Sequence, residues 1–220
     1  MPYRRTETVI RRLAARERAI LTAALGLAAE GGLHAVHIAA VAERAQIAAG
    51  TVYRYFPAKT DLVGAVIANV TARELEAVRA AADAAPGPLS ALAAGIGTFA
   101  ARALGARRLM WALLGEAVDA ELEPLRLEFQ RALAGELDIR IRAAAVRKLL
   151  PEQDLPLSAP AIIGALAQSL LGPLVPVHAD PAAARAAVQD ATLLALRALG
   201  IVDARARGLV AQTVLPAASF

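Results

Sequence analysis

Residues 38–56 read IAAVAERAQIAAGTVYRYF. The pattern predicts a short helix over Ile38–Ala45 and a second one over Ala48–Tyr55, because apolar side chains recur at helical spacing on both sides of a short break. The small side chain of Ala42 lets the two helices approach closely, and apolar Ile47 is placed to fill the angle between them. This pattern is typical of a helix-turn-helix, whose second helix enters the major groove of DNA.

The second helix and the residues after it carry side chains suited to a DNA interface. Thr51, Tyr53 and Arg54 supply hydroxyls and a guanidinium on the face that would meet the bases. Phe56-Pro57 ends the helix, because the residue before a proline disfavours helical backbone angles. Lys59 then starts a long helix whose N-terminal amides can bind a phosphate together with the lysine.

The block Gly50–Leu62, GTVYRYFPAKTDL, resembles the signature of the tetracycline-repressor (TetR) family of bacterial regulators. The segment Ile38–Ala42 and the Gly31-Gly32 pair match as well, and the resemblance covers about residues 15–70. It implies an all-α homodimer of about nine helices. The N-terminal three-helix domain would bind a double-stranded DNA operator, and the C-terminal helical domain would bind a small-molecule effector and form the dimer. We therefore expect a one-component transcriptional regulator, a repressor, without enzymatic activity or cofactor.

The resemblance places the DNA contacts on the recognition helix, at the ends of the neighbouring helices and in the N-terminal arm. The positions are Arg4, Arg5, Arg11, Arg12, His37, Ala49, Gly50, Thr51, Tyr53, Arg54, Tyr55 and Lys59. Four residues depart from the family pattern: Gln46 stands at a turn position that is usually glycine, Ala48 and His37 replace capping hydroxyls, and Ala49 replaces a lysine. We expect a left-handed Gln46 and an uncapped recognition helix, and the lost cap costs about 1 kcal/mol.

Positive charge is concentrated at the N-terminal end. The first 60 residues hold nine Lys or Arg and four Asp or Glu, a net charge of +5, whereas residues 61–220 hold fifteen and sixteen, a net charge of −1. A basic arm over residues 1–12 is expected to add phosphate contacts. The alternative is a solvated tail that only increases solubility.

The rest of the chain predicts helix throughout, and strand signals are absent. We expect the helix-turn-helix domain at 13–58, a connector helix at 59–82, the effector-binding and dimerisation domain at 83–200 and a tail at 201–220. Further helices are expected near 89–104, 106–117, 121–149, 160–173 and 181–199.

The hydrophobic content of 57% raises the question of a membrane protein. The longest uncharged stretch, Leu155–Ala179, is interrupted by prolines and predicts a buried helix rather than a membrane span. The N-terminus lacks the apolar segment of a secretory signal, and the chain has no cysteine. These features favour a cytoplasmic protein that does not bind a membrane.

The resemblance places the effector cavity beside the helix that carries the single tryptophan, and the candidate effector-binding residues are chosen around it. They are Phe99, Met110, Trp111, Leu114, Glu116, Phe129 and Leu133. The alternative for the apolar side chains is ordinary core packing. The acidic cluster Glu116, Asp119, Glu121 and Glu123 is interpreted as a solvated helix start, with cavity-facing Glu116 as the alternative.

The helices near 160–173 and 181–199 combine small and branched side chains, which suits close helix packing. The predicted dimer interface is Ile162, Ile163, Leu166, Leu170, Leu174, Val188, Ala191, Ala195 and Leu199. The alternative is that these residues form only the core of one chain.

Two further function classes stay open. A DNA-binding regulator without an effector, controlled by a partner or purely structural, fits the same pattern, because a cavity leaves no sequence signature. An all-helical enzyme fits poorly, because the chain has no Gly-rich phosphate loop and no nucleophile elbow. His34 and His37 have the spacing of a metal pair, but no third ligand lies nearby, and no metal is expected.

Overall fold

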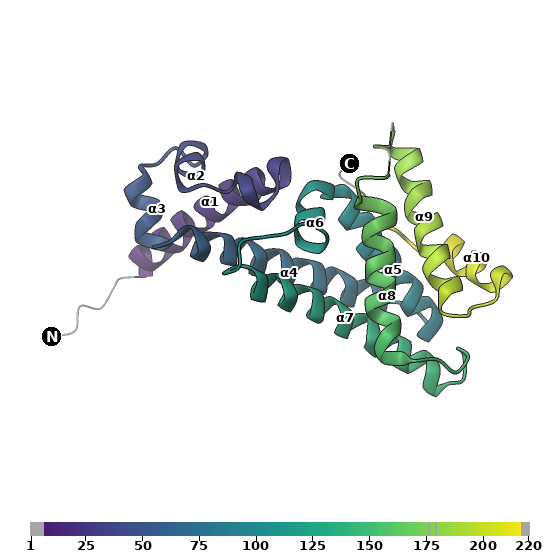
Figure 1. Cartoon of the computed structure of the whole chain (residues 1–220). Coiled ribbons are helices and arrows are strands. Elements are labelled where there is room, and N and C mark those ends of the chain that lie inside the picture. Colours follow the sequence, from purple (N-terminus) through teal and green to yellow (C-terminus); the bar gives the residue numbers. More distant parts are fainter. Residues whose placement is uncertain (1–6, 176, 179, 217–220) are drawn as a thin grey trace.

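The computed structural model describes residues 7–175, 177–178 and 180–216, which form ten α-helices and no strand (Figure 1). The helices are α1 (Glu7–Gly31), α2 (Ile38–Arg44), α3 (Ala49–Tyr55), α4 (Lys59–Asp83), α5 (Pro88–Gly105), α6 (Arg107–Leu114), α7 (Glu123–Val146), α8 (Leu155–Leu166), α9 (Pro181–Ala198) and α10 (Asp203–Gln212). A 3-10 turn, η1 (Leu33–Ala35), follows α1, and a π-helical segment, η2 (Ala167–Leu171), continues α8.

The helices are arranged as a small head and a larger body (Figure 1). Helices α1–α3 form the head, α5–α10 form the body, and α4 runs from one into the other. Buried residues of the head, such as Ile20 and Val52, belong to the same hydrophobic cluster as Phe99 and Phe129 of the body. The head is therefore packed onto the body rather than tethered to it.

Ion pairs that involve two buried carboxylates fix α4 against the body. The Arg102 guanidinium on α5 donates two hydrogen bonds of 2.7 Å to the Glu74 carboxylate on α4. The Glu136 carboxylate on α7 accepts from Arg79 on α4 at 2.6 Å and from Arg140 at 2.8 Å. Because Glu74 and Glu136 are buried, removal of a partner would leave an uncompensated charge in the interior. These pairs therefore fix the register of α4 on α5 and α7.

The all-α class is confirmed, and the structure corrects several predicted boundaries. Helix α1 begins at Glu7, so the second half of the predicted arm is helical. The predicted C-terminal tail contains α10, which packs on α9 and α5. A left-handed Gly200 (φ 82°) ends α9, and a new helix starts at Asp203, whose carboxylate pairs with Arg197 and Arg207. The hydrogen bonds from these two arginines lower the pKa of Asp203.

The helix predicted from residue 160 begins earlier, at Leu155. Pro156 lies in its first turn, where the missing N–H has no intrahelical partner to lose. Within the described ranges, no single helix combines the length and hydropathy of a membrane span. The two helices α5 and α6 reach those values only when taken together, and they are bent by 111° at their junction.

Candidate functional site

A tight turn joins α2 and α3. Gln46 adopts the left-handed conformation predicted for it, with φ 55°, and its N–H donates to the Glu43 carbonyl at 3.0 Å. The Ile47 N–H donates to the Ala42 carbonyl at 3.0 Å, and Val52 of α3 is completely buried beneath the turn. The turn therefore holds α3 at a fixed angle to α2, as a helix-turn-helix requires.

The outer face of α3 is open to solvent. Ala49, Gly50, Tyr53 and Arg54 are exposed, and the Tyr53 side chain keeps 52% of its surface free. Thr51 and Tyr55 are half-buried, and the Arg54 guanidinium lies 5.6 Å from the centre of the Tyr55 ring. Such stacking restricts the orientation of the Arg54 guanidinium. Tyr55 therefore supports Arg54 from the protein side.

Helices α2 and α3 both begin without a side-chain cap, as the sequence predicts from His37 and Ala48. Ala48 precedes α3 in an extended conformation and makes no side-chain cap bond, and His37 does the same before α2. Helix α4 starts differently, because the Asp61 carboxylate accepts a hydrogen bond of 2.9 Å from the Ala58 N–H. Its first residue, Lys59, is half-buried. Its ammonium lies 3.9 Å from the Asp119 carboxylate of the loop between α6 and α7.

The remaining basic residues of the prediction lie on α1 or before it. Arg11 and Arg12 are exposed on the N-terminal half of α1. Helix α1 lies with α2 and α3 in the head (Figure 1). Arg4 and Arg5 lie outside the described residues. Arg44 on α2 donates a hydrogen bond of 2.7 Å to Glu30 on α1, which lowers the pKa of Glu30 and joins the two helices.

His34 and His37 are both exposed. Within the part of the chain that the structure describes, no three His, Asp or Glu side chains gather in a way that could hold a metal ion.

Helix α6 and the loop after it hold the head from the body side. The Arg108 guanidinium lies against Gly32 (φ 75°), where an added Cβ would come within 2.7 Å of Arg108 Nη2. Arg108 also donates a hydrogen bond of 2.5 Å to Glu116. Together with the Lys59–Asp119 pair, these contacts connect the end of α1 and the start of α4 to one body segment. Sequence reasoning missed them, because the partners are distant in the chain and carry no joint pattern.

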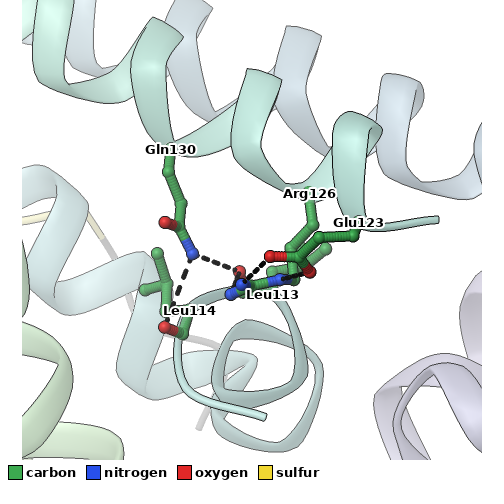
Figure 2. Close-up of polar contacts among 5 residues, drawn as sticks. All are labelled: Leu113, Leu114, Glu123, Arg126 and Gln130. Carbon is green, nitrogen blue, oxygen red and sulfur yellow. Dashed lines mark hydrogen bonds and ion pairs between the residues drawn. The ribbon is translucent and has the colours of Figure 1, made fainter. Parts of the chain in front are cut away.

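Side chains of α7 donate hydrogen bonds to the backbone carbonyls at the C-terminal end of α6 (Figure 2). Gln130 Nε2 donates to the Leu113 and Leu114 carbonyls at 3.0 and 3.5 Å, and Arg126 donates to the Leu113 carbonyl at 3.5 Å. Arg126 is itself held by two hydrogen bonds to Glu123, which lower the pKa of Glu123. Because a helix end leaves its last carbonyls without intrahelical partners, these contacts fix the end of α6 on α7.

The acidic cluster is therefore more than a solvated helix start. Glu116, Asp119 and Glu123 each pair with a basic side chain, and Glu121 is exposed. The Glu116 carboxylate is therefore already paired with Arg108 of the same chain.

The apolar effector candidates are mostly core residues. Phe99, Phe129 and Leu133 are almost completely buried among α5 and α7 neighbours. Met110 is also buried, but it lines a cavity of about 290 Å³ between α1, α4, α5 and α6. Trp111 is half-buried, and its ring fills the space where a side chain at residue 115 would lie. Leu114 and Glu116 line an open depression of about 550 Å³ at the loop after α6.

The structure corrects the predicted dimer face. Eight of the nine residues are buried within one chain: Ile162, Ile163, Leu166, Leu170, Val188, Ala191, Ala195 and Leu199. Only Leu174 is exposed, at 93%. The branched side chains face the core because they bury more apolar area than the small ones. The small side chains of α8, including Ala161, Gly164 and Ala165, are the ones that face solvent.

Residues 20–66 match the family model of bacterial regulatory proteins, tetR family. They are a TetR-family domain. The match runs from the buried half of α1 through α2 and α3 into α4, and it confirms the resemblance read from Gly50–Leu62.

Two curated relatives match the TetR-family domain. Over 72 residues the chain is 46% identical to the HTH-type transcriptional repressor KstR of Rhodococcus jostii (strain RHA1), covering 33% of this chain and 32% of the relative. Over 70 residues it is 46% identical to the KstR repressor of Mycolicibacterium smegmatis, covering 32% of each chain. The match thus spans about a third of the length of these relatives.

Solved structures match the whole architecture at low sequence identity. The crystal structure of RolR in complex with resorcinol superposes with a TM-score of 0.65 and 23% identity, covering 94% of this chain and all of the other. FadR from Bacillus subtilis in complex with stearoyl-CoA gives a TM-score of 0.70 and 19% identity, covering 83% and 98%. These likenesses show that the TetR-family domain and the body together share the overall fold of these two proteins.

The uncapped recognition helix of the TetR-family domain yields a stability prediction. Ala48→Ser should raise the free energy of unfolding by about 1 kcal/mol, because a serine hydroxyl at the N-cap accepts a hydrogen bond from a free backbone N–H of α3. Chemical denaturation followed by circular dichroism measures the change. The matched control is Ala49→Ser, one residue inside the helix, which should not stabilise. Equal effects of the two substitutions would contradict the capping account.

Proposed function

We propose that this chain is a one-component transcriptional regulator, a repressor, that binds a pseudo-palindromic DNA operator as a homodimer and is released by a small-molecule effector. The observation that carries the proposal is the exposed outer face of α3, held by a helix-turn-helix within a TetR-family domain. The relatives named as transcriptional repressors support repression rather than activation. The proposal places the protein in the cytoplasm and includes no enzymatic activity.

Base recognition is proposed for α3. Exposed Tyr53 and Arg54 would reach base edges in the major groove, with Thr51 beside them and Tyr55 orienting the Arg54 guanidinium. The small residues Ala49 and Gly50 let the helix backbone approach the DNA closely, and an added Cβ at Gly50 would meet no atom within 4 Å.

Phosphate contacts are proposed around α3. Lys59 at the start of α4 and exposed Arg11 and Arg12 on α1 supply positive charge on the head. Arg4 and Arg5, which precede α1 in the sequence, add to this charge. His37 lies exposed before α2 and is a further candidate. Such contacts carry no sequence information but set affinity and its dependence on salt.

The contacts of α6 support a coupling between the body and the head. In the free protein Asp119 lies beside Lys59, so it would compete with a phosphate of bound DNA for the same ammonium. An effector that displaces α6 or its loop would change the position of α4 and of Lys59 together. Its effect on operator affinity is a coupling free energy, so the operator must weaken effector binding by the same factor.

The exposed small-residue side of α8 is the proposed dimer face, in place of the buried residues that the sequence suggested. Leu157, Ala161, Gly164 and Ala165 recur at helical spacing on this side, and Leu157 is 64% exposed. Small residues allow two helices to approach closely, and a symmetric pairing would bring the same face of α8 from both protomers together.

A regulator without an effector is the second candidate. The side chains of Phe99, Phe129 and Leu133 fill the centre of the body, which supports a body that only dimerises or docks a partner. Ligand titrations of the DNA-free protein decide between the two candidates.

Selection of bound DNA from a random pool tests the proposed function. We expect a pseudo-palindromic consensus whose half-sites lie about one helical turn, ~34–36 Å, apart. Arg54→Ala should lose about 1–3 kcal/mol of operator binding and relax base preference at two symmetric positions. Arg147→Ala, an exposed arginine at the end of α7, is the matched control and should leave binding unchanged. An unenriched pool, or full selectivity in Arg54→Ala, would overturn the proposal.

The dimer face is tested with two glycines in equivalent environments. Gly164 on α8 and Gly135 on α7 are both exposed helical positions where an added Cβ meets no atom within 4 Å. Gly164→Glu should convert the dimer to monomer, because two buried carboxylates would face each other, whereas Gly135→Glu should remain dimeric. Sedimentation velocity measures both. A monomeric parent protein, or a dimeric Gly164→Glu variant, would rule out this face.

A further inference from the structure

The cavity between the head and the body carries a separate inference. It has a volume of about 290 Å³ and lies where α1 meets α4, α5 and α6. Leu25 and Ala29 of α1 and Leu109 and Met110 of α6 supply apolar walls. Ligand pockets in proteins combine such walls with a few polar groups that fix orientation, and volumes of roughly 300–1,000 Å³ are typical. The volume of this cavity is just below that range.

Three charged residues also line the cavity: Arg73, Glu74 and Arg102. Glu74 and Arg102 neutralise each other through two hydrogen bonds of 2.7 Å. Arg73 is exposed, and within the described residues no carboxylate lies within 4.0 Å of its guanidinium. Among the described residues, the lining therefore carries one positive charge without a carboxylate partner. A guanidinium binds a carboxylate through two parallel hydrogen bonds, which makes the carboxylate its preferred small organic partner.

We propose that this cavity binds a small monocarboxylate with an apolar body, such as a single-ring aromatic acid, and that Arg73 holds its carboxylate. The apolar walls from α1 and α6 would cover the body of the ligand, and the cavity is too small for an acyl-CoA. The class of ligand rests on the proposed effector response, but binding at this site can be measured without DNA.

The position of the cavity gives the ligand a route to the DNA-binding surface. One wall belongs to α1 of the TetR-family domain, and the opposite walls belong to α5 and α6 of the body. A molecule between them would set the spacing of α1 and α6, and Arg108 of α6 also lies against Gly32, the residue that follows α1. Occupancy therefore acts on the joint that orients the head.

Calorimetric titration of the full, DNA-free chain tests the proposal. The probes are benzoate and phenylacetate, with benzamide and phenylacetamide as uncharged controls of the same shape. Fluorescence of Trp111 provides a second readout, because this tryptophan follows Met110 on α6 and is the only one in the chain. We expect at least one carboxylate to bind and its amide to bind at least about tenfold more weakly, because charge-assisted hydrogen bonds are lost.

Two variants with opposite expected effects locate the site. Arg73→Gln should weaken carboxylate binding about tenfold, since it removes the guanidinium that would hold the ligand's carboxylate. Arg147→Gln, directly after the end of α7, should not weaken it. Glu74→Gln should tighten binding, because it frees the Arg102 guanidinium for the ligand. Circular dichroism melting confirms that each variant is folded.

Three results would overturn the site: no binding of any carboxylate at millimolar concentration, equal binding of acid and amide, or equal affinity in Arg73→Gln and Arg147→Gln. Failure of the proposed function is distinguishable from these. A palindromic DNA consensus without carboxylate binding removes only the site, and carboxylate binding without DNA selection removes only the regulator.

Discussion

Helix α4 has to pack in two places at once, and the rest of the structure depends on this constraint. Its first turns are buried in the head, where Leu62 and Val66 are fully enclosed, and its later turns are fixed in the body by Glu74 and Arg79. A continuous helix of 25 residues is about 37 Å long and bends little. A shift at the body end must therefore appear at Lys59, beside the recognition helix.

Two local features of the head cost folding free energy, and the packing of the head offsets this cost. Gln46 holds a left-handed conformation that disfavours a side chain, at about 1 kcal/mol, and α3 begins without a cap. Val41 and Val52 are completely buried and fill the space between α2 and α3. Burial of two valines contributes more than the missing cap and the turn cost, at about 1.5–3 kcal/mol for each side chain. The helix-turn-helix thus remains rigid while its outer face consists of small and polar residues.

Local pattern was enough to predict much of this structure. The helix-turn-helix, the all-α class and the left-handed Gln46 follow from residues within one or two turns of each other, where spacing and turn chemistry act directly. The face of α8 could not be predicted in this way, because small and branched residues alternate on it and only tertiary packing decides which side is buried. The pairs Lys59–Asp119 and Arg102–Glu74 join distant segments, so no local rule identifies them. Helix α10 was missed because Gly200 ends α9 so clearly that the chain beyond it read as a tail.

The central claim is that the head is held at a fixed orientation on the body by α1, α4 and α6. The chain contains no cysteine, so Glu43→Cys on α2 and Glu128→Cys on α7 can be spin-labelled specifically. Both positions are exposed, one on the head and one on the body. Pulsed dipolar spectroscopy on protein diluted with unlabelled chain measures the distance between the labels within one protomer. The account predicts one narrow distribution, and a broad distribution, as from a head that swivels on a flexible joint, would contradict it.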